Sequence, residues 1–77
     1  MPDYENEKRI AAIAAVEKIE EGMVVGLGSG STAAYAIRAI GELVSKGKSI
    51  VGVPTSVESE RLAKNVRIPL TTNPRWI

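Results

Sequence analysis

Residues 28–32 read GSGST, so two glycines alternate with three hydroxyl-bearing residues. Gly28 and Gly30 allow a tight turn and a close approach of the backbone to a ligand, because no Cβ stands in the way. Ser29, Ser31 and Thr32 add hydroxyl groups that can donate hydrogen bonds to phosphate oxygens. A helix that begins here would add N–H groups and the positive end of its dipole. The spacing therefore predicts an anion cradle, most plausibly for a phosphate monoester.

A purely structural role is the alternative for the same turn. A glycine-rich connection lets a strand and a helix pack closely, and Ser31 would then be the N-cap of that helix. Such a turn needs one or two glycines and does not need three hydroxyl-bearing residues beside them. We therefore favour the cradle.

Two nucleotide-binding motifs are partly matched, but each lacks a further residue that the motif requires. Gly28, Gly30 and Ala33 satisfy G-x-G-x-x-A, but that fingerprint also requires an acidic residue about 20 residues later. The second predicted strand ends in VGVPTS, without a carboxylate. GKS at residues 47–49 lacks the P-loop glycine, because Glu42 stands five residues before Gly47.

The elements that must position the turn follow from hydrophobic periodicity. A helix over about residues 5–21, ended by Gly22, presents these apolar side chains at helical spacing: Ile10, Ile13, Ala14, Val16 and Ile19. Short apolar runs at residues 23–27 and 49–53 predict strands, the first covered on both faces. Between them a second helix, ended by Gly47, places on one side Ala33, Ile37, Ile40 and Val44.

A third helix is predicted to open at residues 55–58, TSVE, where Thr55 and Glu58 have the spacing of a capping box. Residues 68–72 predict a third strand, with Pro69 near its start or at a sheet edge. The connections suit right-handed crossovers, so the fold class is α/β, a Rossmann-like three-layer unit. Its short parallel sheet with crossover helices would run β-α-β-α-β after an initial helix. Ligands of such sheets lie beyond the carboxyl ends of the strands, at residues 28–32 and 54–56.

Composition narrows the class of protein. The 77 residues, 44% hydrophobic and 25% charged, predict one α/β unit over residues 1–77. The sequence has no histidine and no cysteine, which excludes a histidine proton shuttle, thiolate chemistry and disulfides, and we expect no metal site. A net charge of +1 gives no case for nucleic acid or a membrane surface as partner. No apolar run approaches a membrane span and the start is too acidic for a targeting peptide, so we expect a cytoplasmic protein.

VVGLGSGSTAAYAI at residues 24–37, followed by IVGVPTS at residues 50–56, resembles ribose-5-phosphate isomerase of type A. The likeness extends over about residues 7–70, and two motifs in register are far more specific than either glycine pattern. Ser29 stands where the family usually has threonine, which retains a hydroxyl. The resemblance implies an aldose-ketose isomerase of the pentose phosphate pathway. Such an enzyme interconverts D-ribose 5-phosphate and D-ribulose 5-phosphate through an enediolate, without a metal or organic cofactor.

Carried onto this chain, the family's substrate-binding turn falls on Ser29, Gly30, Ser31 and Thr32, beside Gly28. Thr55 and Ser56 belong to a second turn that flanks the same pocket, and the capping box is an equally good explanation of Thr55. The family's aspartate-rich motif, lysine-glycine motif and catalytic glutamate come later than any residue present here, and Glu58 is explained as half of a cap. We therefore expect no catalytic residue in this chain.

The resemblance thus predicts the amino-terminal part of a longer isomerase domain, truncated and inactive alone, with a divergent tail at residues 71–77 in which Trp76 has no core to enter. Two alternatives remain. One is a sugar-phosphate-binding or sensor module, which binds without turnover. The other is a structural fragment stabilised by self-association, because three parallel strands leave open edges and uncovered faces. We expect a homo-oligomer with a small-molecule sugar phosphate as ligand.

Overall fold

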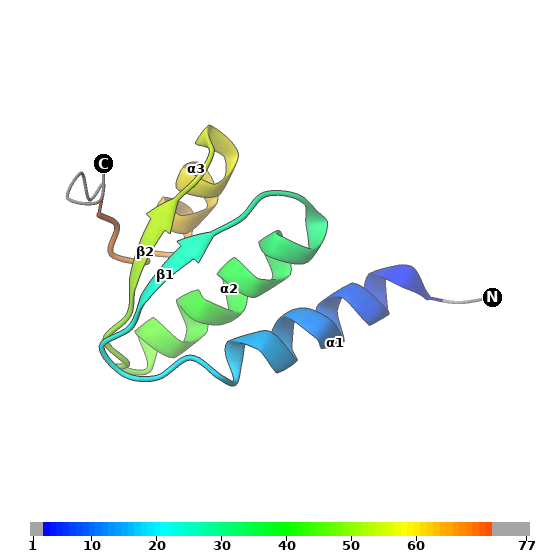
Figure 1. Cartoon of the computed structure of the whole chain (residues 1–77), viewed down its shortest axis with the longest axis horizontal. Coiled ribbons are helices and arrows are strands. Elements are labelled where there is room, and N and C mark those ends of the chain that lie inside the picture. The colour runs from blue at the N-terminus through cyan, green and yellow to red at the C-terminus, as the bar shows by residue number, and fades with distance from the viewer. Residues whose placement is uncertain (1–2, 72–77) are drawn as a thin grey trace.

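The computed structural model describes residues 3–71, where three helices and two strands alternate (Figure 1). They are α1 (Tyr4–Val16), β1 (Val24–Leu27), α2 (Ser31–Ser45), β2 (Val51–Pro54) and α3 (Val57–Asn65). The strands are parallel, with Val25 opposite Gly52 and Leu27 opposite Pro54. The predicted α/β fold, with parallel strands joined by crossover helices, is confirmed.

The third predicted strand, at residues 68–72, is reduced to one parallel bridge between Leu70 and Gly52. The Gly52 N–H donates to the Pro69 carbonyl at 2.8 Å, and the Thr71 N–H donates to the Gly52 carbonyl at 3.0 Å. Pro69 has no N–H of its own with which to extend this pairing. Residue 72 and the rest of the predicted tail, Trp76 included, lie outside the described residues.

The core lies between the strands and the helices. Its buried side chains are Val16, Leu27, Ile37, Ile40, Ile50, Ala63 and Ile68. Because all three helices contribute to this one cluster with Leu27, they cover the same face of the sheet. On the other face of β1, Val24 is 61% exposed. The expectation that this strand is covered on both faces is wrong within residues 3–71, which form two of the three predicted layers.

Helix α1 ends at Val16, earlier than the predicted residue 21. Beyond the helix, backbone N–H groups donate to carbonyls three residues earlier and so form a tight turn. The Ile19 N–H, for example, donates to the Val16 carbonyl at 2.9 Å. The last turn of α1 carries no basic residue, Glu17 follows it directly, and over residues 17–21 three acids outnumber the single base, Lys18. Negative charge at this end opposes the helix dipole, so the sequence stops favouring a helix here.

The face that α1 presents to α2 also differs from the expectation. Ile10 and Ile13 are 57% and 45% exposed, although their spacing predicted a core position. Val16 is buried as predicted, and Ala12, one helical turn before it, is buried where the pattern did not place a core residue. The small side chain of Ala12 suits a close approach to α2. Periodicity thus identified the helix and Val16 on its buried side, but it placed Ile10 and Ile13 there in error.

The starts of the other elements are shifted by one or two residues. Gly30 is the N-cap of α2, so Ser31 is the first helical residue and not the cap. Strand β2 begins at Val51, two residues later than predicted, and before it the Ser49 N–H donates to the Glu21 carboxylate at 3.0 Å. Ile37 and Ile40 are buried as the pattern of α2 predicted, and the chain turns beyond it at Gly47, with φ 100°.

Candidate anion-binding site

The two turns that follow the strands meet at one edge of the sheet. Ser29 Oγ lies 2.6 Å from Ser56 Oγ, so the two hydroxyl groups share a hydrogen bond. The Thr55 hydroxyl donates to the Leu27 carbonyl at 2.5 Å, and the Thr55 N–H reaches the same carbonyl at 3.3 Å. Parallel strands bring their carboxyl ends together at this edge. The structure therefore brings Ser29 together with Thr55 and Ser56, which belong to a second motif 26 and 27 residues later in the sequence.

The backbone at Gly30 opens the N-terminus of α2 to solvent. Its φ of 94° and ψ of 176° fall in a region that essentially only glycine adopts. Gly30 has no side chain that could cap the helix, and no side-chain hydrogen bond caps it. Ser31 and Thr32 are exposed in the first turn. The first-turn N–H groups and the hydroxyls of this turn thus lie together where the cradle is predicted, and the cradle itself stays a prediction.

Gly28 has a different role from Gly30. A Cβ at Gly28 would lie 3.6 Å from the Cβ of Ala33, an ordinary packing distance, and its φ is not positive. The residue lines a small apolar hollow of about 250 Å³ between α1, β1 and α2. Gly28 thus lies beneath the cradle, where strand and helix pack.

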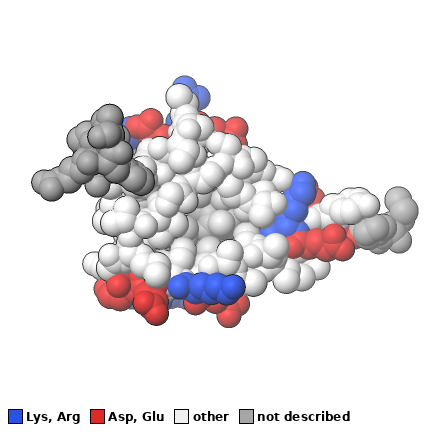
Figure 2. Space-filling view, in the orientation of Figure 1, with Lys and Arg blue, Asp and Glu red and all other residues white. Residues whose placement is uncertain are grey.

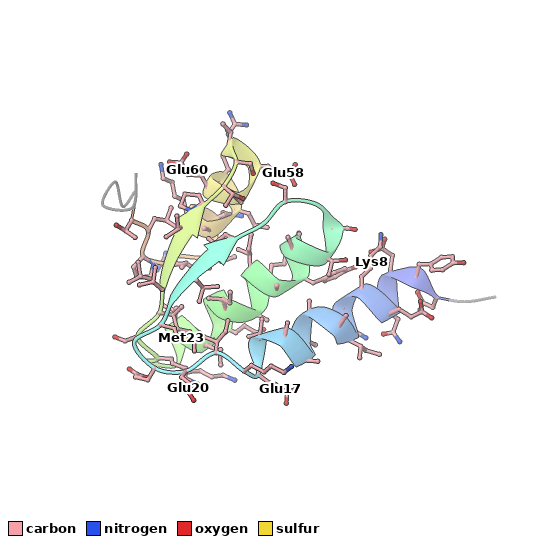
Figure 3. All side chains as sticks on the ribbon, in the orientation of Figure 1. Lys8, Glu17, Glu20, Met23, Glu58 and Glu60 are labelled. Atoms are coloured by element: carbon pink, nitrogen blue, oxygen red, sulfur yellow. The ribbon has the colours of Figure 1, made fainter. Side chains whose placement is uncertain are left out.

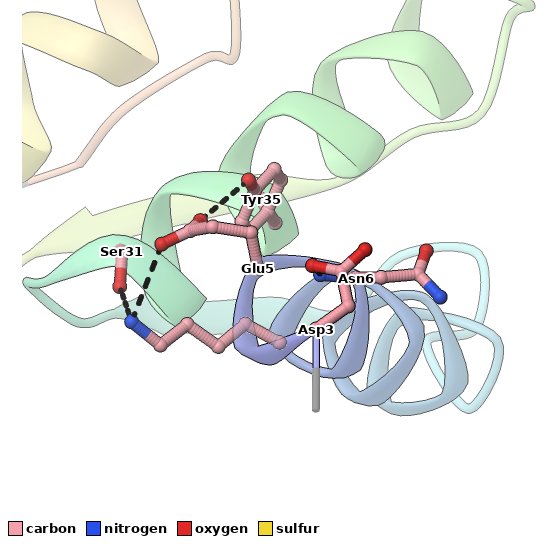
Figure 4. A network of polar contacts seen from close by, with 6 residues as sticks. Asp3, Glu5, Asn6, Ser31 and Tyr35 are labelled. Atoms are coloured by element: carbon pink, nitrogen blue, oxygen red, sulfur yellow. Dashed lines mark hydrogen bonds and ion pairs between the residues drawn. The ribbon is translucent and has the colours of Figure 1, made fainter. Parts of the chain in front are cut away.

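Lys8 is a member of this site that sequence reasoning missed. Its Nζ donates to Ser31 Oγ at 2.8 Å and lies 3.6 Å from Glu5 Oε1 (Figure 4). The ammonium group therefore places a positive charge beside the cradle from α1. One signal was present, since Lys8 lies one helical turn before Ala12 and shares its stripe, but the sequence did not show that this stripe faces α2.

Glu5 and Tyr35 hold the ends of α1 and α2 together next to Lys8. The Tyr35 hydroxyl donates to Glu5 Oε2 at 2.7 Å. This hydrogen bond, followed by the charge of Lys8, holds the pKa of the Glu5 carboxyl below its ordinary value. The same hydrogen bond raises the pKa of Tyr35. Glu5 is therefore kept as a carboxylate that pairs with the ammonium group of Lys8.

The capping box of α3 lies one residue later than predicted, on Ser56 and Ser59. The Ser59 N–H donates to Ser56 Oγ at 3.0 Å, and the Ser56 N–H donates to Ser59 Oγ at 3.1 Å. The roles predicted for Thr55 and Glu58 in the cap are therefore wrong. Glu58 instead points toward the turn between β1 and α2, where Oε1 accepts the Gly30 N–H at 3.4 Å (Figure 3).

Other features of residues 3–71 do not compete with this site. A hollow of about 1050 Å³ lies between α2 and α3, and its lining includes Glu58 but none of the predicted site residues. Within the described part of the chain, no three acidic side chains gather as metal ligands would, and no helix is long and apolar enough to cross a membrane.

The chain matches no protein-family model. It is 55% identical over 65 residues to ribose-5-phosphate isomerase A of Listeria innocua, which covers 84% of this chain and 29% of that protein. The solved structure of ribose 5-phosphate isomerase A from Methanocaldococcus jannaschii matches with a TM-score of 0.85 at 41% identity, covering 90% of this chain and 31% of that one. A D-ribose-5-phosphate isomerase solved in complex with phospho-erythronic acid matches with a TM-score of 0.86 at 44% identity, covering 95% and 32%.

The resemblance predicted from the two motifs is confirmed by these matches, which fit an amino-terminal portion of the relatives. The chain spans less than a third of the length of each of them. Their names support the isomerase interpretation and neither the sensor module nor the structural fragment.

Proposed function

We propose that this chain, which resembles the amino-terminal portion of type A ribose-5-phosphate isomerases, supplies the phosphate-binding turn of such an enzyme. The reaction would be the interconversion of D-ribose 5-phosphate and D-ribulose 5-phosphate. One observation carries the proposal: the contact of Ser29 with Ser56, which brings the two motifs of the resemblance together at the open end of α2. The chain would be one α/β unit of a longer isomerase domain.

The ligand follows from the chemistry of the donors. Gly30 offers an N–H, Ser31 and Thr32 offer hydroxyls, and Lys8 offers a positive charge beside them. Such a set favours an acceptor with several oxygens and more than one negative charge, which a phosphate monoester is. One structural relative was solved with phospho-erythronic acid, a phosphorylated ligand, which supports this choice. Thr55 and Ser56 would form the second wall of the pocket.

The proposed role in catalysis is to bind and orient. Proton transfer through an enediolate needs a carboxylate base at the carbon-bound proton and hydrogen-bond donors at the developing oxyanion. Two carboxylates lie near the cradle: Glu5 pairs with Lys8, and Glu58 accepts the Gly30 N–H, a donor proposed for phosphate. A base at that place would face the phosphate end of the sugar. We therefore assign no catalytic residue to this chain and no metal or cofactor to its site.

Calorimetric titration of the purified chain tests the proposal. We expect saturable binding of ribose 5-phosphate, weaker binding of inorganic phosphate and none of ribose. In the same samples we expect no ribulose 5-phosphate above the uncatalysed background. Equal binding of ribose and its phosphate ester would contradict the proposed ligand, and turnover by the purified chain would contradict the assignment of catalysis to other residues.

A homo-oligomer and a cytoplasmic location stay predictions. The exposed face of β1 at Val24 supports the first, because an uncovered apolar face gains stability when another copy covers it. The second rests on composition alone.

A further inference from the structure

Glu58 lies where a ligand anion would bind. Its Oε1 accepts the hydrogen bond of the Gly30 N–H, the N-cap donor of α2. We propose that the Glu58 carboxylate is an internal competitor for the phosphate group, which a ligand must displace from the Gly30 N–H before it can bind. This inference rests on the proposed function, since it concerns the regulation of that same site.

The position of Glu58 is set by contacts on both sides of the cradle. It is the second residue of α3, and the box of Ser56 with Ser59 determines where α3 begins. Ser56 in turn contacts Ser29, one residue before Gly30, at 2.6 Å between the hydroxyl oxygens. The start of α3 is therefore held against the turn that precedes α2. The carboxylate reaches the Gly30 N–H over this short span, as Figure 3 shows by the direction of the Glu58 side chain.

The charges at this edge explain why a carboxylate is accepted there. Helices α2 and α3 both begin at this edge of the sheet, and the N-terminus of each helix favours a negative charge nearby. The contact is long for a hydrogen bond, at 3.4 Å, and both residues are exposed. It is therefore weak enough for a phosphate group to displace, because a phosphate can also bond to Ser31 and Lys8.

Displacement has a cost that every phosphate-bearing ligand shares. The ligand must take the N–H from Glu58, and it then lies close to a carboxylate of the same charge. Removal of the Glu58 charge should raise the affinity for ribose 5-phosphate and for inorganic phosphate by a similar factor, because both ligands present a phosphate group to Gly30. An effect on the sugar ester alone would indicate a contact with its hydroxyl groups instead.

The test compares Glu58→Gln with Glu60→Gln in calorimetric titrations. Both variants remove one negative charge from the first turn of α3, but Glu60 pairs with Lys64 at 3.2 Å and points away from the turn (Figure 3). We expect Glu58→Gln to tighten both phosphate ligands about two- to fivefold, the range of an exposed charge interaction, and Glu60→Gln to leave both unchanged. The gain should shrink at higher salt concentration.

Amide shifts without ligand separate this inference from the proposed function. Glu58→Ala should move the Gly30 amide resonance, since its hydrogen-bond acceptor is removed. Phosphate binding that is unchanged or weaker in Glu58→Gln would overturn the inference and leave the proposed function in place. If neither wild type nor variants bound a phosphate ligand, the proposed function would fail and the competition with it, even with a shifted Gly30 amide.

Discussion

At the scale of single residues, Gly30 determines the shape of the cradle. Its backbone conformation is one that costs other residues about 1–3 kcal/mol. A Cβ at this position would meet no heavy atom within 4 Å, so a substitution is opposed by backbone strain and not by crowding. The residue can relieve that strain only by turning its N–H and the first turn of α2 away from their present directions.

Gly30→Ala should therefore lose phosphate binding together with about 1–3 kcal/mol of unfolding free energy. Gly22→Ala is the matched control, because Gly22 also has a positive φ, 84°, and open space around its missing Cβ. It should lose stability of the same order and keep its affinity for ribose 5-phosphate. Urea unfolding and calorimetric titration measure the two effects. Unchanged binding in Gly30→Ala would mean that the turn is only a packing element, and equal loss in both variants would assign the effect to lost stability.

Lys8 carries the second prediction at this scale. Lys8→Met should lower the affinity for ribose 5-phosphate about fivefold or less, which is the range for an exposed charge. The affinity of the variant should also depend less on salt concentration. Arg9→Met removes the same charge from the next residue, whose guanidinium bonds to Asn6 at 2.6 Å, and should change little. Titrations at two salt concentrations distinguish the variants. The same affinity loss in both would assign the effect to general charge.

The predictability of single residues depended on whether their partners were close in sequence. The hydroxyl-bearing residues and glycines of the GSGST turn could be identified from the local sequence alone. Lys8 and Glu58 reach the turn from other helices, so only the fold brings them there. Glu58 was misread because Ser59 closes the capping box in its place, and a serine at that position is a weaker sequence signal than glutamate.

At the scale of elements, the start of α3 depends on Ser56 in two ways. Its hydroxyl caps the helix and also contacts Ser29. Ser56→Ala should lower the unfolding free energy by about 1 kcal/mol, the usual cost of an N-cap. Ser29→Ala removes the same inter-turn contact without the cap and should cost less. Chemical unfolding of both variants tests this, and equal losses would show that the inter-turn contact, not the cap, stabilises α3.

The packing of α1 on α2 should depend on pH through Glu5 and Tyr35. Folding lowers the pKa of Glu5. The contribution of Glu5 to the free energy of unfolding is therefore complete above its unfolded-state pKa and is lost as pH falls through its folded-state pKa. Folding raises the pKa of Tyr35, so that contribution is complete below the unfolded-state pKa and is lost as pH rises through the folded-state one.

Tyr35→Phe should therefore be less stable than wild type at neutral pH, and the difference should narrow in both acid and strong alkali. Unfolding in urea across the pH range measures it. Tyr4→Phe, at a residue that is 66% exposed, is the control and should follow wild type. A Tyr35→Phe difference that stays constant across pH would contradict the role of the hydrogen bond.

The type of each element could be predicted where the local hydrophobic pattern was strong. The boundaries of helices and strands could be predicted only where no tertiary contact shifted them. The alternation of helix and strand followed from periodicity, and Ile37 and Ile40 identified the buried side of α2. The sequence could not show that Ala12, and not Ile10, faces α2, since a small residue is chosen there for close approach. The third strand failed because Pro69 interrupts its pairing.

At the scale of the whole molecule, apolar surface remains uncovered. Ile10, Ile13 and Val24 are all more than 40% exposed. Figure 2 shows uncharged atoms across the middle of the face on which the strands are seen, with charged side chains along its rim. The exposed apolar side chains favour association with another apolar surface.

We therefore expect the purified chain to self-associate through this exposed apolar surface, to which α1 contributes Ile10 and Ile13, with a mass that rises with concentration in sedimentation equilibrium. Ile10→Glu combined with Ile13→Glu should shift it to monomer, because each change places a charge in the contact. Val57→Glu alters an equally apolar residue, 65% exposed on α3, and should leave the association unchanged. A monomeric wild type at every concentration would contradict the prediction.

The measurement that tests the central claim most directly is an NMR titration of the chain with ribose 5-phosphate, with ribose as the control. The account predicts saturable shifts of the backbone amides of residues 28–32 and of Ser56, because these groups form the proposed cradle. Ribose should leave them in place. A well-dispersed spectrum in which ribose 5-phosphate moves none of these amides would contradict the claim that this turn binds phosphate.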